Sequence, residues 1–348
     1  MELTTVWFLL IALLWTGYFV LEGFDFGVGM LLPVLGRGQD AAETDTNRRV
    51  MINTIGPVWD GNEVWVLVAG GATFAAFPEW YATLFSGFYL PLLLILLALI
   101  ARGVAFEYRG KIDDPTWRRR WDHAIVVGSL LPAVLWGVAF ANIVRGVPID
   151  ADHQFTGNLF TLLNPYALLG GVTTLTLFLL HGAAFLALRT EGPVRLRAQR
   201  LAARLAPVTL VVAGAFAVWT QLAYGKGWTW VAVVVAAAAL VGAVAATAAV
   251  REGTAFVLTT VVIVAAVVLL FGALFPNVMP SSTDAANSLT TANASSTPYT
   301  LKVMTWVAVI LTPFVVLYEG WSYWVFRQRV SSSHVPAAIG LSPFGRRT

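Results

Sequence analysis

The sequence is poor in several kinds of residue, and each shortage excludes a class of protein or site. It contains no cysteine, so disulfides, thiolate catalysis and cysteine-based metal centres are excluded. Only 12% of its 348 residues are charged and 58% are hydrophobic, whereas soluble domains have about 25% charged residues. No basic segment precedes the first apolar run, which favours a retained membrane span over a cleaved signal peptide. Together these shortages indicate an integral membrane protein.

The apolar residues form repeated runs that are each long enough to cross a bilayer, which takes about 20 residues. We therefore expect an all-α integral membrane fold, with a single polytopic domain over residues 1–330 and a disordered cytoplasmic tail over residues 331–348. The nine expected transmembrane helices lie at 6–35, 51–77, 80–102, 122–144, 163–188, 202–222, 228–250, 254–275 and 301–326.

The basic residues are distributed unequally about these spans. When successive spans alternate in direction, all of the 22 Lys and Arg residues except Arg145, Lys226 and Lys302 fall on one side. Basic loop residues favour the cytoplasm, so the N-terminus is expected outside and the C-terminus in the cytoplasm. A missing or added span would remove this asymmetry, which therefore supports nine. The run Arg118-Arg-Arg120 fits a topology determinant near anionic headgroups and does not indicate nucleic-acid binding.

Two acidic pairs inside the apolar runs are the strongest chemical signal. Glu22 and Asp25 lie in the first span, and Asp60 and Glu63 lie in the second, where Pro57 should loosen the helix. A spacing of three places both members of a pair on one helix face. An acidic residue at the helix centre costs about 2.5–3.5 kcal/mol on insertion, so such residues are usually functional.

Arg102 and Glu107 extend this polar set at the end of the third span. Arg102 is either a partner of the acids or an arginine that snorkels to the interface. Carboxylates in a low dielectric can exchange protons near neutral pH, and these acids run from the cytoplasmic half to mid-membrane. The pattern predicts a proton inlet from the cytoplasm. The alternative is a satisfied polar network that only fixes helix packing.

Redox metal chemistry is not expected within this chain. A bis-histidine haem needs two histidines in the membrane, and of the four histidines only His181 lies well inside a span. His181 is either a single axial haem ligand or, as we favour, a hydrogen-bonded packing residue. No histidine-rich cluster of the kind that holds copper occurs in the apolar runs. The sequence thus predicts no metal ligated by this chain.

At these motifs the chain resembles subunit II of the bacterial cytochrome bd-type quinol oxidases. The matching segments appear in family order between about residue 15 and residue 326 and are specific only in combination. They are Gly23-Phe-Asp-Phe-Gly-Val-Gly29, Met51-Ile-Asn53, Trp59-Asp-Gly-Asn62, Val64-Trp65, Phe85-Ser-Gly-Phe-Tyr89, Lys111-Ile112, Gly146-Val-Pro148, Thr156-Gly-Asn158, Leu163-Asn-Pro165, Met279-Pro-Ser-Ser-Thr283 and Val303-Met-Thr-Trp-Val-Ala308.

The resemblance implies two four-helix bundles plus a peripheral helix, in a heterodimer with a homologous subunit I of the bacterial cytoplasmic membrane. Subunit I would hold the b-type and d-type haems and oxidise quinol. Some complexes of the family also have a small third subunit, and some members bind a structural quinone. The chain described here would stabilise subunit I and line a proton pathway for the reduction of oxygen to water.

The resemblance also carries roles to individual residues. Asp25 and Asp60 would be pathway acids, and Arg102 with Glu107 would belong to a polar cluster on the cytoplasmic side. Glu22 and Glu107 stand where the family often has Asp, which keeps the charge. Glu63 stands where the family often has Gln, which argues against an essential proton at this position.

Two rival functions remain open at the level of sequence. A proton-coupled transporter would usually show inverted repeats and paired broken helices, whereas here only the first two spans look unusual. A purely structural assembly subunit would need the same buried acids as a proton pathway. Sequence alone does not separate the structural role from the proton-pathway role.

Overall fold

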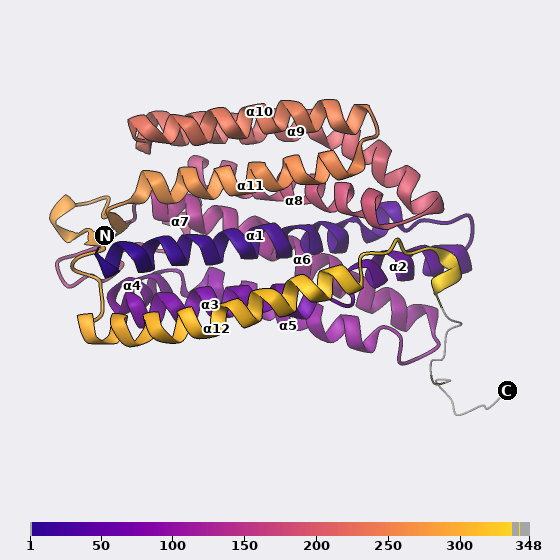
Figure 1. The fold of residues 1–348 in the computed structure, drawn as a ribbon, viewed down its shortest axis with the longest axis horizontal. Helices are drawn as coiled ribbons and strands as arrows, with labels where there is room; N and C mark the ends of the chain where they lie inside the picture. The colour runs from indigo at the N-terminus through magenta and orange to yellow at the C-terminus, as the bar shows by residue number, and fades with distance from the viewer. Residues whose placement is uncertain (1, 336–340, 342–348) are drawn as a thin grey trace.

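The computed structural model describes residues 2–335 and residue 341, and these residues are mostly helical (Figure 1). The elements in chain order are α1 (Leu3–Leu35), α2 (Ala41–Ile55), α3 (Trp59–Ala76), α4 (Pro78–Gly87), α5 (Tyr89–Tyr108), α6 (Pro115–Arg145), α7 (Leu159–Leu162), α8 (Pro165–Arg189), α9 (Gly192–Tyr224), η1 (Gly227–Thr229), α10 (Trp230–Ala248), α11 (Glu252–Leu274), β1 (Asn277–Met279), η2 (Ala285–Asn287), β2 (Leu289–Thr290), α12 (Pro298–Val325) and η3 (Ser332–His334).

Within the described residues, eight helices are long and apolar enough to cross a membrane. This agrees with the expected all-α membrane protein, while the ninth span stays a prediction. The eight are α1, α5, α6, α8, α9, α10 together with η1, α11 and α12. The two regions that differ from the sequence-based expectation are spans 51–77 and 80–102.

The expected continuous span 51–77 is broken into two helices. α2 ends at Ile55 and α3 begins at Trp59, so Gly56, Pro57 and Val58 form a connection between them. Pro57 has no backbone N–H and its ring clashes with a preceding turn, which explains why the helix stops here and does not merely loosen.

The expected span 80–102 is also displaced. The short helix α4 follows the Phe77–Pro78 turn, and the long helix begins only at Tyr89 and continues to Tyr108. Phe88, with φ −102° and ψ 20°, interrupts the helix between the two. Arg102 is therefore inside α5, more than one turn before its end, whereas the sequence placed it at the terminus of a span.

α1 is the central helix of the molecule. It packs against α3 and α6 on one side and against α8 and α11 on the other, while α8, α9, α10 and α11 pack against one another (Figure 1). The closest approach is between α1 and α8 at Gly27 and Gly182. A Cβ added at Gly27 would lie 2.1 Å from the Phe178 carbonyl oxygen, so only glycine permits this crossing.

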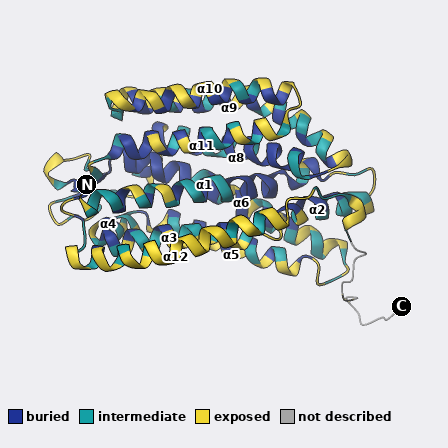
Figure 2. Cartoon of the chain, viewed as in Figure 1, coloured by how far each residue is buried: buried dark blue, intermediate teal, exposed yellow. Residues whose placement is uncertain are grey.

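α12 is the most loosely attached long helix. It packs against α1 and α3, and nearly all of its residues after Leu301 are exposed or half-buried (Figure 2). Its last residue, Val325, lies at the opposite end of the helical layers from the start of α1 (Figure 1). Before α12, the antiparallel strands β1 and β2 pair Asn277 with Thr290 and Met279 with Leu289.

The predicted disordered tail, residues 331–348, lies largely outside the described residues. In the described part of it, η3 packs against α2.

Candidate functional site

The centre of the site is the side chain of Arg102, which α5 directs into the protein. This side chain is fully buried and forms ion pairs with two carboxylates from other helices. One is Glu22 of α1, also fully buried, and the other is Glu63 of α3, whose Oε2 atom is 3.1 Å from Arg102 Nη2. The structure therefore decides the question that the sequence left open: Arg102 is a partner of the acids and does not snorkel to the interface.

Two aromatic rings flank the guanidinium group of Arg102. Its Cζ atom lies 4.7 Å from the centroid of the Phe26 ring and 5.6 Å from that of Phe106. The positive charge is thus held by carboxylates at one end and by ring faces at the sides. Such a cation, removed from water, fixes the electrostatic potential felt by the acids around it.

Asp25 lies one turn after Glu22 on α1 and belongs to the same buried region. Its Oδ2 atom accepts a 2.8 Å hydrogen bond from Asn62 Nδ2 of α3. The Oδ1 atom of the same Asn62 accepts a 2.6 Å hydrogen bond from the hydroxyl of Tyr323 on α12. A short chain of hydrogen bonds therefore joins α1, α3 and α12. Both Asn62 and Tyr323 were missed as site residues by sequence reasoning.

The two missed residues differ in how visible they were. Asn62 stands between Asp60 and Glu63 in an apolar run, and a buried amide in such a run is itself a signal. Tyr323 lies in an aromatic segment 261 residues away in sequence from Asn62. No local pattern could have assigned it, because its role depends on where α12 docks.

Asp60 does not join this cluster. It is exposed on the surface of the described chain, at the second residue of α3, whereas Asn62 is fully buried. Residues two positions apart in an α-helix are separated by about 200° around the helix axis, so Asp60 and Asn62 face opposite ways. The sequence placed Asp60 with the buried acids, but α3 buries the face that carries Asn62, so the side chain of Asp60 points outward.

Glu107 is also exposed and does not reach Arg102. At this end of α5 the buried group is Arg109, whose Nε atom lies 2.6 Å from Asp122 Oδ1 and whose Nη2 atom lies 2.8 Å from Asp45 Oδ1. Arg48 adds a second contact to Asp122 at 2.8 Å. These ion pairs tie α2, α5 and α6 together near the cytoplasmic end predicted from the sequence, and sequence reasoning assigned none of them.

His181 is fully buried between α1, α8 and α11. Its Nδ1 atom is 2.7 Å from the Thr259 hydroxyl, its Nε2 atom is 3.1 Å from the Val20 carbonyl oxygen, and its ring stacks on Phe256 with centroids 4.6 Å apart. Protein groups occupy both ring nitrogens, so neither is available to iron. The geometry favours the packing role over the haem-ligand role.

We expect His181→Gln to leave the haem spectrum of the complex unchanged. Its amide can bond Thr259 or the Val20 carbonyl, and the lost ring packing would destabilise the protein by about 1–3 kcal/mol. The check is the reduced-minus-oxidised difference spectrum per mole of purified complex. Selective loss of one haem band would contradict the packing role.

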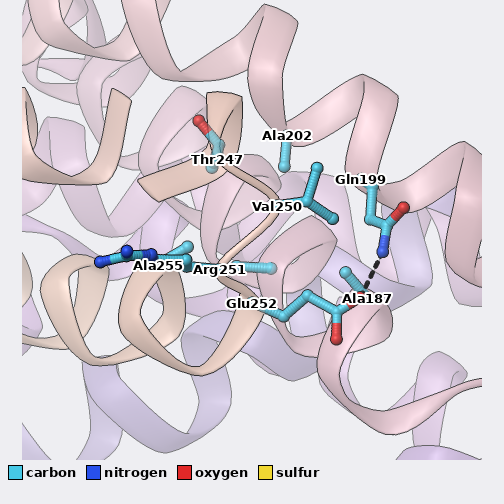
Figure 3. A pocket seen from close by; sticks show the side chains of 9 residues that line it. Ala187, Gln199, Ala202, Thr247, Val250, Arg251, Glu252 and Ala255 are labelled. Atoms are coloured by element: carbon cyan, nitrogen blue, oxygen red, sulfur yellow. Dashed lines mark hydrogen bonds between the residues drawn. The ribbon is translucent and has the colours of Figure 1, made fainter. Parts of the chain in front are cut away.

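Some cavities of the described chain are lined mainly by apolar side chains and others by charged ones. One of about 560 Å³ lies between α3, α4 and α5 and reaches Glu63. A very small one, about 10 Å³, adjoins Glu252 at the start of α11 (Figure 3) and is no larger than one water molecule needs. Glu252 there accepts hydrogen bonds from Gln199, Arg195 and Arg329, which makes it a structural tie. Among residues 2–335 and 341, no group of three or more His, Asp or Glu side chains could hold a metal ion.

Comparison with known proteins decides the family. A model of the family "Cytochrome bd terminal oxidase subunit II" matches residues 3–326, which is nearly the whole chain. The chain belongs to this family. The resemblance inferred from the motifs is thereby confirmed, and the chain is a multi-pass membrane subunit of an oxidoreductase complex, which implies a subunit I partner.

This chain aligns with its relatives over almost their full length. The cytochrome bd ubiquinol oxidase subunit 2 of Bacillus subtilis is 45% identical over 335 residues, covering 95% of this chain and 97% of the relative. The cytochrome bd-I ubiquinol oxidase subunit 2 of Escherichia coli K12 is 38% identical over 370 residues, covering 95% of this chain and 96% of the relative. A chain in the structure of bd oxidase from Geobacillus thermodenitrificans shares the fold, with a TM-score of 0.75 and 16% identity over 94% of this chain and 99% of that one.

Proposed function

We propose that this chain is the non-haem-ligating subunit II of a bacterial cytochrome bd-type quinol:oxygen oxidoreductase. In this role it stabilises the haem-bearing subunit I and supplies a cytoplasmic proton pathway for the reduction of oxygen to water. The observation that carries the proposal is the cluster of the fully buried Glu22, Asp25 and Arg102 with the partly buried Glu63 inside apolar helices. Ionisable groups at such positions are costly and are kept mainly where ions or protons move.

The chemistry of the cluster suits proton transfer. The reduction of oxygen to water consumes protons, and a carboxyl group can accept and release one without leaving its place. Within the described residues, Glu22 Oε2, Asp25 Oδ1 and two nitrogens of Arg102 have no hydrogen-bond partner. Buried polar atoms of this kind are normally satisfied by water, so we infer that water enters the cluster and completes the path.

Asp60 fits the proposal from the opposite face of α3. An exposed carboxylate on a membrane helix must be covered by protein or water, so we infer that subunit I covers this face. The stripe below it consists of Val64, Leu67, Gly71 and Phe74, all exposed. A Cβ added at Gly71 would meet nothing within 4 Å, so a partner helix could approach closely.

The arrangement of spans follows from the same proposal. α2 and α3 together would form the ninth crossing, broken at Pro57, with the N-terminus outside and the C-terminus in the cytoplasm. The opposite positions of the start of α1 and the end of α12 support an odd number of crossings (Figure 1). One four-helix bundle would contain α1, α2–α3, α4–α5 and α6, the other α8 to α11, and α12 would be the peripheral helix.

The b-type and d-type haems are assigned to subunit I, because the bonds of His181 do not fit a ligand role in this chain. Quinol is the proposed electron donor, and membrane lipids surround the apolar faces of the bacterial cytoplasmic membrane protein. A small third subunit could add to the complex without contributing to the cluster described here.

The test is Asp60→Asn in the intact complex. We measure oxygen consumption with a quinol donor and, in the same membranes, the reduced-minus-oxidised haem spectrum. Loss of activity with wild-type haem content would support proton transfer that involves Asp60. Loss of both signals would assign Asp60 to assembly with subunit I. Wild-type activity together with wild-type haem content would remove Asp60 from the proposal.

A further inference from the structure

The peripheral helix α12 forms side-chain hydrogen bonds with two residues of α3 beside the acid cluster. Trp65 Nε1 of α3 donates to Glu319 of α12 at 3.0 Å, and the Tyr323 hydroxyl of α12 donates to Asn62 Oδ1 of α3 at 2.6 Å. The two contacts are about one helical turn apart on each helix. Only the second contact continues to a buried acid, since Asn62 Nδ2 donates to Asp25.

The direction of the Asn62 amide determines which form of Asp25 it stabilises. An amide group carries a donor at one end and an acceptor at the other. With its NH₂ group toward Asp25, Asn62 bonds an ionised carboxylate. With its carbonyl oxygen toward Asp25, it would bond only a protonated carboxyl. Among the described residues, no side chain other than Tyr323 bonds the Asn62 carbonyl oxygen.

The charged and titratable groups around Asp25 come from each neighbouring helix that carries one. They are Glu22 on α1, Glu63 on α3, Arg102 on α5 and Tyr323 on α12, and Glu319 of α12 lies near Tyr323. On α8, His181 points away, to the Val20 carbonyl and Thr259. The neighbouring carboxylates disfavour a further negative charge on Asp25, whereas Arg102 and the Asn62 amide donor stabilise that charge.

We propose that Tyr323 is a positioning residue for Asp25, which fixes the amide of Asn62 so that its NH₂ group faces the carboxylate. This inference rests on the proposed proton pathway and adds a component supplied by the peripheral helix. Tyr323 does not carry the proton itself. By donating to the carbonyl end of Asn62, it keeps Asp25 able to release a proton toward the next acceptor.

The surroundings of Tyr323 explain why the phenol is suited to this task. Its ring lines a cavity of about 520 Å³ between α1, α8, α11 and α12, together with Phe24, Phe185 and Arg189. The ring is thus held among apolar groups while its hydroxyl reaches Asn62. Phenylalanine would keep the ring in this place and remove only the donor.

The experiment uses Tyr323→Phe in the complete oxidase. Without the phenol donor the Asn62 amide can turn, so Asp25 retains its proton more readily. We expect oxygen consumption at neutral pH to fall by roughly three- to tenfold, the effect of about one lost hydrogen bond. We also expect the pH profile of activity to move upward by roughly half a unit to one unit. Haem content should stay at the wild-type level.

The matched control is Trp65→Phe, which removes the other α12–α3 hydrogen bond but leaves Asn62 untouched. If Tyr323 only attaches α12, both variants will lower activity without moving the pH profile, and the positioning role is wrong. In an Asn62→Leu background, Tyr323→Phe should have no further effect on the pH profile. An additional shift there would equally overturn the proposal.

Asp25→Asn separates this inference from the proposed function on which it rests. If Asp25→Asn retains wild-type activity, the proton-pathway proposal fails, and the positioning role fails with it. If Asp25→Asn is inactive while Tyr323→Phe keeps the wild-type pH profile, the pathway stands and only the positioning role is overturned.

Discussion

Arg102→Leu is expected to prevent stable assembly of the oxidase. Leucine leaves the buried carboxylate of Glu22 without its cation and also removes the partner of Glu63. Breaking a buried ion pair by removing one member typically costs about 3–5 kcal/mol, because the remaining charge stays away from water. This is a large share of the roughly 5–15 kcal/mol by which a typical protein is stable. The amount of assembled complex and its thermal unfolding temperature measure the effect.

The physical cause can be tested by removing the stranded charges as well. The triple variant Arg102→Leu, Glu22→Gln, Glu63→Gln should recover part of the lost stability, because it leaves no uncompensated charge. Arg200→Leu serves as the control, since Arg200 is an exposed residue of α9. Arg102→Leu with wild-type yield and thermal stability would show that the ion pairs do not hold α1, α3 and α5 together.

Asp25→Asn is expected to lower quinol oxidase activity by about 10²-fold while the haem content is retained. Asparagine has nearly the same shape, and its side-chain oxygen can still accept the bond from Asn62, so packing should survive. It cannot take up and release a proton, and a positioned proton donor or acceptor contributes roughly 10²-fold or more to a rate. The measurement is oxygen consumption per haem in purified complex.

Asp152→Asn is the matched control, because Asp152 is exposed in the connection between α6 and α8. It should retain wild-type activity. Equal activity of Asp25→Asn and the wild type would remove Asp25 from the pathway. Loss of haem together with activity would instead assign Asp25 to assembly and favour the purely structural role of the cluster.

These predictions concern different properties of one cluster. Arg102 acts on the folded state, since its charge balances two carboxylates that the fold has already buried. Asp25 acts on the reaction, because its carboxylate is positioned by Asn62 while its other oxygen has no hydrogen-bond partner among the described residues. A variant at either position therefore separates stability from proton transfer by comparing haem content with turnover.

The sequence by itself determined the class of protein and its family. Long apolar runs can be satisfied only by spanning helices, and this local requirement can be read from composition. It also marked Glu22, Asp25, Glu63 and Arg102, because a charge in an apolar run is expensive wherever the helix packs. The motifs that match the family are likewise local, so they were visible without coordinates.

Only the tertiary structure decided how these residues are used. Asp60 faces outward, although its spacing from Glu63 had predicted a shared buried face, because α3 buries the face that carries Asn62. α5 continues to Tyr108, beyond the expected end, which placed Arg102 inside the helix, while Glu107 is exposed. Helical periodicity predicts which residues share a face, whereas the packing of the helix decides which face is buried.

The contact between Tyr323 and Asn62 is the clearest case of a role that the sequence could not determine. The two residues are 261 positions apart, and no pattern in either segment links one to the other. Their meeting depends on the docking of α12 against α1 and α3, to which hydrogen bonds of Trp7, Trp65 and Tyr323 contribute. Local pattern specifies which side chains a helix offers, whereas the packing of distant helices specifies which of them meet.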